Sequence, residues 1–192
     1  SRYQARSSAA LAAIGLALGV PAVIVAAVAA EQNATPLGNL AADRLSIVSF
    51  VVRRPDGRHL HHNAVVALLN DLFGIQSRAG CSCAGPYGHR LLGIDNATSE
   101  LYRDWVRKGY LGIKPGWCRV GFHYTMDDAE AAFVMEAVEF VAGYGYRFLR
   151  LYRFDPATGI WAHRHYREVR EEFSLDEALK ATGCDATALP LA

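Results

Sequence analysis

The sequence predicts an α+β fold: a small, mostly antiparallel sheet covered on one face by two helices. Strand-like and helix-like segments alternate through the middle of the chain, the strands are few, and the connections between them are short. Apolar residues make up 52% of the 192-residue chain, which is enough to bury a core of this kind. We therefore expect two amphipathic helices to pack on one side of a small sheet.

The chain divides into three predicted parts. Residues 1–41 are an alanine-rich apolar segment followed by a linker, 42–145 form the α+β domain, and 146–192 form an extension with a β-hairpin and a short helix. Residues 7–30 carry no charge, which is typical of a signal or membrane-anchor segment. Two glycines and a central Pro21 oppose a spanning helix, so we favour a buried helix over 7–20 and an apolar run over 23–28, with membrane anchoring as the alternative.

Charge and cysteine usage narrow the class of protein. The formal net charge is +1, with acids and bases interspersed, so charge alone does not indicate a nucleic-acid partner. The four cysteines are few for this length, and Cys81 and Cys83 are too close for a comfortable disulfide. We expect reduced thiols and a cytoplasmic location. The chain begins without Met, so we also expect that its natural beginning is missing.

The first half of the domain reads as strand, turn, helix, strand. The β-branched run 45–52 predicts a strand, 55–57 a turn, and 58–61 a returning extended segment. Asn63 is the expected cap of a helix that runs to Leu72 and ends at Gly74. A short strand is predicted over 75–78. The expected core face of the helix is Val65, Leu68, Leu69 and Leu72.

The second half predicts helix, strand, helix and hairpin. Ser99 is the expected cap of a helix over 100–108, and 117–124 reads as a strand. Thr125 is the expected cap of a long helix over 126–143, which has acids in its first turn. Segments 148–154 and 160–165 predict a hairpin, and Ser174 opens a capping box for a last helix. The expected core stripe of the long helix is Ala132, Phe133, Val134, Ala137, Val138 and Val141.

The segment Arg78–Arg90, hereafter the site loop, has the composition of a chemical site. It holds two thiols, three glycines and a proline between two arginines, so we expect it to lack regular structure. Positive charge beside an exposed thiol favours its reactive thiolate form. Cys83 is therefore the candidate nucleophile, and Cys81 has the weaker claim; a small buried cysteine in a packed turn is the alternative.

Two further patterns leave alternatives open. Cys81 and Cys83 with His89, and with His61, His62 or His123, contain metal-ligand types, but one Cys-x-Cys without a second such pair is a weak zinc signal. The pair His61–His62 fits a helix entrance better. Arg119 stands mid-strand between apolar neighbours, where an arginine either faces a partner or cleft, or points to solvent on the uncovered face.

The site loop and the Arg119 strand together resemble a known family. The loop reads Arg-x-Gly-x-x-Cys-Ala-x-Pro from Arg78 to Pro86, and Pro115 to Arg119 reads Pro-x-x-x-Arg. This order, followed by an acid-started helix, resembles the C-terminal small domain of class V aminotransferase-fold enzymes over residues 42–144. These are fold type I pyridoxal-phosphate (PLP) enzymes that include cysteine desulfurases and selenocysteine lyases.

The resemblance implies a role for three residues. Cys83 falls on the nucleophile that takes sulfur from substrate cysteine, Arg119 on the arginine that binds the substrate α-carboxylate, and Arg78 on the arginine that begins the loop. A guanidinium fork is what a carboxylate clamp requires. Cys81-Ser82 stand where desulfurases of the family often have a histidine just before the nucleophile, so the parent reaction stays open.

The resemblance also implies what this sequence lacks. In the family, the Schiff-base lysine, the acid at the pyridine nitrogen and most phosphate contacts belong to a large N-terminal domain; the sequence contexts of Lys108, Lys114 and Lys180 do not match that lysine. We expect a chain that is inactive alone and does not hold PLP covalently. Its expected partner is the missing large domain or a second polypeptide, with a homodimeric parent. A non-catalytic interaction domain and a thiol-redox or metal protein are the alternatives.

Overall fold

The computed structural model describes residues 33–39, 45–81 and 85–167. Several predictions fall on other parts of the chain. The helix over 7–20, the apolar run over 23–28, Cys83 and the last helix opening at Ser174 lie outside the described residues. Among the described residues, no helix combines the length and the apolar character needed to cross a bilayer.

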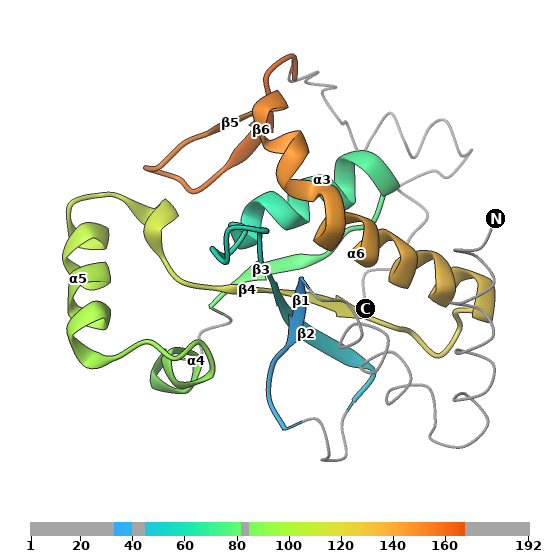
Figure 1. The fold of residues 1–192 in the computed structure, drawn as a ribbon, viewed down its shortest axis with the longest axis horizontal. Helices are drawn as coiled ribbons and strands as arrows, with labels where there is room; N and C mark the ends of the chain where they lie inside the picture. Colours follow the sequence, from blue (N-terminus) through green and yellow to red (C-terminus); the bar gives the residue numbers. More distant parts are fainter. Residues whose placement is uncertain (1–32, 40–44, 82–84, 168–192) are drawn as a thin grey trace, which may run out of the picture.

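A four-stranded antiparallel sheet lies at the centre of the fold (Figure 1). Its spatial order is β1 (Ala34–Pro36), β2 (Ile47–Val52), β4 (Trp117–Gly121) and β3 (Arg78–Gly80). In the register, Ser49 of β2 faces Arg119 of β4, and Arg119 faces Arg78 of β3. The predicted strand over 45–52 is thus confirmed, whereas the strand predicted over 75–78 begins at Arg78 and that over 117–124 ends at Gly121.

Helices α3 (His62–Phe73) and α6 (Asp128–Phe148) pack on the sheet in one hydrophobic core. Because strand side chains alternate between the two faces, Val48, Phe50, Cys118 and Val120 enter this core while Ser49 and Arg119 point to the opposite face. The predicted α+β architecture, with a small antiparallel sheet and helices against it, is therefore confirmed. The fully buried centre comprises Phe50, Leu68, Leu69, Val48, Val65, Val138, Val141 and Cys118.

The predicted helix caps Asn63, Ser99 and Thr125 are wrong, because in each case the residue immediately before the helix supplies the acceptor. His61, and not Asn63, caps α3: its side chain accepts from the Asn63 amide. Asp95, and not Ser99, caps α5 (Asn96–Arg107) by accepting from the Thr98 amide at 2.7 Å. Helix α6 begins after a capping box in which Asp127 and Glu130 satisfy each other's backbone amides, and it runs to Phe148 rather than 143.

Two predicted core residues are exposed. Leu72 retains 41% of its surface and Phe133 retains 48%. Leu72 lies in the last turn of α3, after the last buried residue of that helix, Leu69. The ring of Phe133 on α6 meets Phe73 edge-on. Gly74 does end α3, in the left-handed conformation (φ 68°) that a glycine adopts without strain.

The site loop is more regular than its composition predicts. Arg78–Gly80 form β3, and Gly85–Leu91 form the short helix α4, so the expectation of an irregular loop is wrong for both ends. Pro86 lies in the first turn of α4, where its missing amide hydrogen costs nothing. Helix α5 then projects from the sheet as an arm (Figure 1) without burying any residue, and the 3-10 turn η1 (Leu111–Ile113) leads back to β4.

A hairpin of β5 (Tyr152–Phe154) and β6 (Trp161–His163) follows α6 and the short turn η2 (Leu149–Leu151), which confirms the predicted hairpin. Two side-chain hydrogen bonds fix it to α3. The Tyr152 hydroxyl donates to an Asp71 carboxylate oxygen at 2.7 Å, and the Asn63 amide nitrogen donates to the Gly159 carbonyl at 2.8 Å. The hairpin is therefore attached to α3 near both ends of the helix.

Candidate functional site

Two arginines face each other on the sheet side that α3 and α6 leave uncovered. Arg78 and Arg119 are register partners on adjacent antiparallel strands, so their side chains leave the same face. Arg78 is exposed and Arg119 is half-buried, and Ser49 continues the same row on β2. The structure thus brings together two of the three residues predicted for the site.

The charges of this pair are not offset within the described part of the chain. The ion pairs formed there are Arg54 and Arg58 with Asp56, Arg103 with Glu100, and Arg107 with Asp104. Like charges directly opposite each other in a ladder are destabilising. An anion placed between two guanidinium groups removes that repulsion and gains charge-assisted hydrogen bonds. Chemically, the pair is suited to a carboxylate or phosphate oxygen.

The cysteines occupy different environments. Cys81 follows β3 directly and is exposed, beside a hollow of about 200 Å³ that His89 also lines. Cys118 is buried in the sheet, its Sγ lies 3.2 Å from the His62 carbonyl oxygen, and burial raises the pKa of its thiol. Cys118 is therefore a packed core residue and not a nucleophile, whereas Cys81 is placed at the same sheet edge as Arg78.

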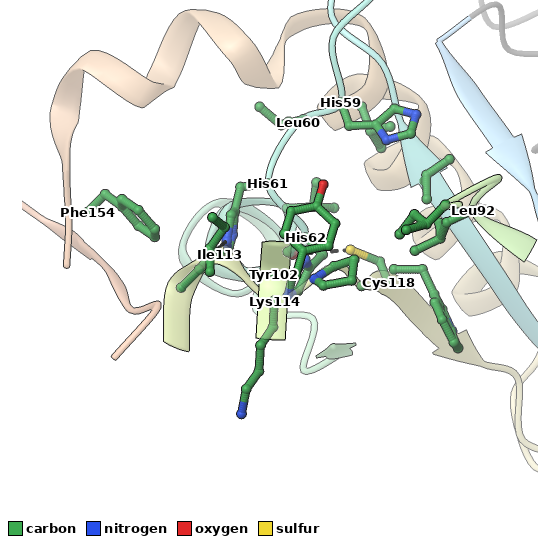
Figure 2. A pocket seen from close by; sticks show the side chains of 18 of the residues that line it. His59, Leu60, His61, His62, Leu92, Tyr102, Ile113, Lys114, Cys118 and Phe154 are labelled. Carbon is green, nitrogen blue, oxygen red and sulfur yellow. Dashed lines mark hydrogen bonds between the residues drawn. The ribbon is translucent and has the colours of Figure 1, made fainter. Parts of the chain in front are cut away.

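A larger cavity, of about 760 Å³, lies where the sheet meets the α5 arm and the hairpin. We call it the histidine cavity, because His59, His61 and His62 line it (Figure 2). Aromatic and apolar side chains form most of its wall. They come from β2 and β4, from the α4–α5 arm, from the η1 segment and from the hairpin, and include Leu92, Ile94, Tyr102, Trp105, Tyr110, Ile113, Trp117 and Phe154.

His61 has both ring nitrogens engaged. Nε2 lies 2.8 Å from the Gly112 carbonyl oxygen and must donate to it, so Nδ1 is the acceptor for the Asn63 amide that begins α3. Burial lowers the pKa of His61, against a smaller opposing effect of the Gly112 hydrogen bond. The imidazole is therefore neutral near pH 7, and its two hydrogen bonds connect the start of α3 to η1.

His62 is the ring best placed to meet a ligand. It stacks on His61 with ring centroids 4.4 Å apart, and no hydrogen bond to its ring nitrogens is formed by the described residues. Burial, and secondarily the neighbouring His61, lower the pKa of His62 to about 4. At neutral pH His62 is thus an uncharged imidazole with an available donor and an available acceptor.

The described residues do not gather a metal site. His61, His62, His89, His123 and Cys81, the ligand types that the sequence offers, form no group of three or more with metal-binding geometry in the part of the chain that is described. The pair His61–His62 lies at the entrance of α3, as predicted.

The histidine cavity was not predicted from the sequence. Its walls come from segments far apart in the sequence, and their meeting depends on tertiary contacts such as Gly112 against Gly159. The sequence does contain a weak signal for such a site. The run His59-Leu60-His61-His62 and the aromatic residues Tyr102, Trp105 and Tyr110 are residue types that commonly line ligand pockets.

Comparisons of the chain with family models, with curated proteins and with solved structures returned no match.

Proposed function

We propose that this chain is the carboxylate-binding part of a PLP-dependent enzyme similar to the class V aminotransferases, inactive without a large domain or second polypeptide. The observation that carries the proposal is the cross-strand pair of Arg78 and Arg119. These are the residues that the resemblance assigns to the substrate side of the site, and the exposed Cys81 directly follows the strand that carries Arg78. Cys83 is the proposed nucleophile.

The described residues do not by themselves fit the cofactor. PLP requires a lysine for its carbonyl carbon and an acid at its ring nitrogen. Within the described ranges of the chain, no Asp or Glu lines the histidine cavity or the smaller hollow beside Cys81. Of the described lysines, Lys108 lies over the Trp105 ring at 4.9 Å, and Lys114 points away from the other side chains drawn in Figure 2. The lysine and the acid that PLP requires are therefore expected from the completing polypeptide.

The test of carboxylate binding uses propionate as the probe and the arginine side-chain Nε–Hε signals in NMR as the readout. We expect saturable shifts of the Arg78 and Arg119 signals in the wild-type chain. Arg119→Lys keeps the charge but loses the planar fork, so it should weaken binding about tenfold. Arg153 is an exposed arginine of β5, so Arg153→Gln is the matched control and should leave binding unchanged. Equal affinity in Arg119→Lys and wild type would contradict the proposal.

The test of incompleteness uses PLP itself. After incubation with PLP and borohydride reduction, mass spectrometry of the chain should find no single lysine modified in a 1:1 ratio. If one lysine (Lys108, Lys114 or Lys180) were modified stoichiometrically, the chain would hold the cofactor covalently. That result would contradict the proposal that the chain needs a partner to bind PLP.

A further inference from the structure

We propose that the histidine cavity binds a flat aromatic carboxylate, with the ring inside the cavity and the carboxylate at Lys114. This site is distinct from the arginine pair, because neither Arg78 nor Arg119 lines the cavity. The proposal does not rest on the proposed function.

The size and lining of the cavity select an aromatic body. A volume of about 760 Å³ lies within the range of small-molecule sites, which are largely apolar with a few convergent polar groups. Tyr102 and Trp105 come from α5, Trp117 from β4 and Phe154 from the hairpin, so aromatic faces and edges surround the space from several directions. Flat rings gain offset-stacked or edge-on contacts with such walls in addition to area burial.

The charges of the lining select the sign of the ligand. Among the residues that the structure describes, no acidic side chain lines the cavity and Lys114 is the one cationic residue of its lining. Figure 2 shows the Lys114 chain leading away from the ring cluster, with its nitrogen at the end farthest from the other labelled side chains. A ligand with its ring among the aromatic residues and its carboxylate directed outward would meet this ammonium group, whereas a cationic ligand would meet no opposite charge.

His62 supplies the polar contact inside. Its imidazole is uncharged and stacked on His61, which is itself held by Gly112 and the Asn63 amide, so the ring has a fixed orientation. With its nitrogens uncommitted among the described residues, it can donate to or accept from a hydroxyl or ring nitrogen on the ligand. Such a group on the aromatic body is expected to add specificity.

The experiment compares three probes of one size: 2-naphthoate, 2-naphthamide and 2-naphthylmethylammonium. Binding to the full chain is followed by NMR chemical-shift mapping at pH 7.5. We expect saturable binding mapped to His62, Tyr102 and Phe154, with naphthoate about three- to fivefold tighter than the amide, as an exposed ion pair allows, and the ammonium weakest. No saturable binding, shifts confined to α6, or the ammonium binding tightest would each overturn the proposal.

Four variants test the assignment further. Tyr102→Ala removes an aromatic wall and should weaken naphthoate binding at least about fivefold, while Tyr144→Ala, an exposed ring on α6 outside the cavity, should not change it. Because Tyr102→Ala removes a side chain that packs on the fold, Lys114→Met provides the second check. It should abolish the preference of naphthoate over naphthamide and leave naphthamide affinity intact. Arg119→Gln should leave naphthoate affinity unchanged; loss there would place the probe on the arginine pair and overturn the proposal.

Discussion

Gly116, which lines the histidine cavity, packs closely against the backbone of Gly80 in β3. A Cβ at this position would stand 2.7 Å from the Gly80 carbonyl carbon, 2.8 Å from Gly80 Cα and 2.9 Å from His62 Cε1. Two of these neighbours are backbone atoms of β3 and cannot turn aside as the end of a flexible side chain does. The absence of a side chain at Gly116 therefore sets how closely the η1–β4 segment approaches both β3 and His62.

Gly116→Ala should lower the free energy of unfolding by about 1 to 3 kcal/mol, because the added methyl group overpacks this contact. Gly121→Ala is the matched control: it lies on the same strand segment with open space around its Cβ position, and should be neutral. Urea unfolding followed by tryptophan fluorescence measures both. If the two variants unfold at the same urea concentration, the close approach is not as described.

His62 should make stability depend on pH. Its pKa is about 4 in the folded chain against 6.5 for an ordinary histidine, so the unfolded chain binds the extra proton first. The contribution is therefore fully present above pH 6.5 and is lost as pH falls from 6.5 toward 4, by about 2 kcal/mol given partial exposure.

The measurement is urea unfolding at several pH values between 7.5 and 4. His62→Phe keeps a stacking ring without a titrating group and should reduce the slope of this part of the profile. His165→Phe changes an exposed ring and should not. A profile for His62→Phe with the wild-type slope would refute the assignment to His62.

At the scale of elements, the two 12-residue helices α3 and α5 differ in what they bury. Helix α3 buries Ala64, Val65, Leu68 and Leu69, whereas α5 buries no residue and is held by contacts of its aromatic side chains, such as Trp105 edge-on to Tyr110. Local opening costs little where few apolar contacts are broken. One wall of the histidine cavity is thus built from the less stable helix.

Hydrogen exchange should show this difference. Amides in the middle of α5 are expected to exchange at least about tenfold faster than those in the middle of α3, because local opening exposes less apolar surface. Equal protection of the two helices would mean that α5 opens only with the whole fold. Saturating 2-naphthoate should slow exchange in α5 more than in the C-terminal half of α3, which does not line the cavity.

The first turn of α6 offers a sharper test of local stabilisation. Asp127→Ala removes a side chain that accepts from the Glu130 amide at 2.8 Å, and should cost about 1 kcal/mol. Asp128→Ala removes an acid of the same turn that does not form the cap, and should cost less. Thermal unfolding of the two variants compares them directly; an equal loss would show that charge, and not the cap, matters.

These elements also show what sequence patterns can and cannot predict. The run 47–52 and Gly74 were predictable because alternation and left-handed backbone are local properties. The caps were not predictable, since neighbouring residues could cap each helix equally well and tertiary contacts determine which one does. His61, for example, caps α3 while it also forms a hydrogen bond to Gly112, 51 residues away. The histidine cavity escaped prediction for the same reason. Arg78 and Arg119 are register partners, and the role that the sequence predicts for them stays a prediction.

At the scale of the whole molecule, the sheet has one face in the core and one that carries the facing arginines. Placing two like charges opposite each other lowers stability until an anion binds, and a ligand that binds only the folded state stabilises it by mass action. Sodium sulfate should therefore raise the Tm of the wild-type chain more than that of Arg119→Gln, measured at equal ionic strength against sodium chloride. An equal rise in both would indicate a general salt effect.

The contact between the hairpin turn and η1 constrains the length of the chain there. The amides of Leu111 and Gly112 donate to the carbonyls of Ala157 and Pro156, and a Cβ at Gly112 would meet Gly159 Cα at 3.0 Å. Hairpin turns are ordinarily the places where a chain accepts insertions. Here an added residue between Asp155 and Gly159 would move the turn away from η1 and change the shape of the cavity wall. The contact with η1 therefore fixes the length of this hairpin turn.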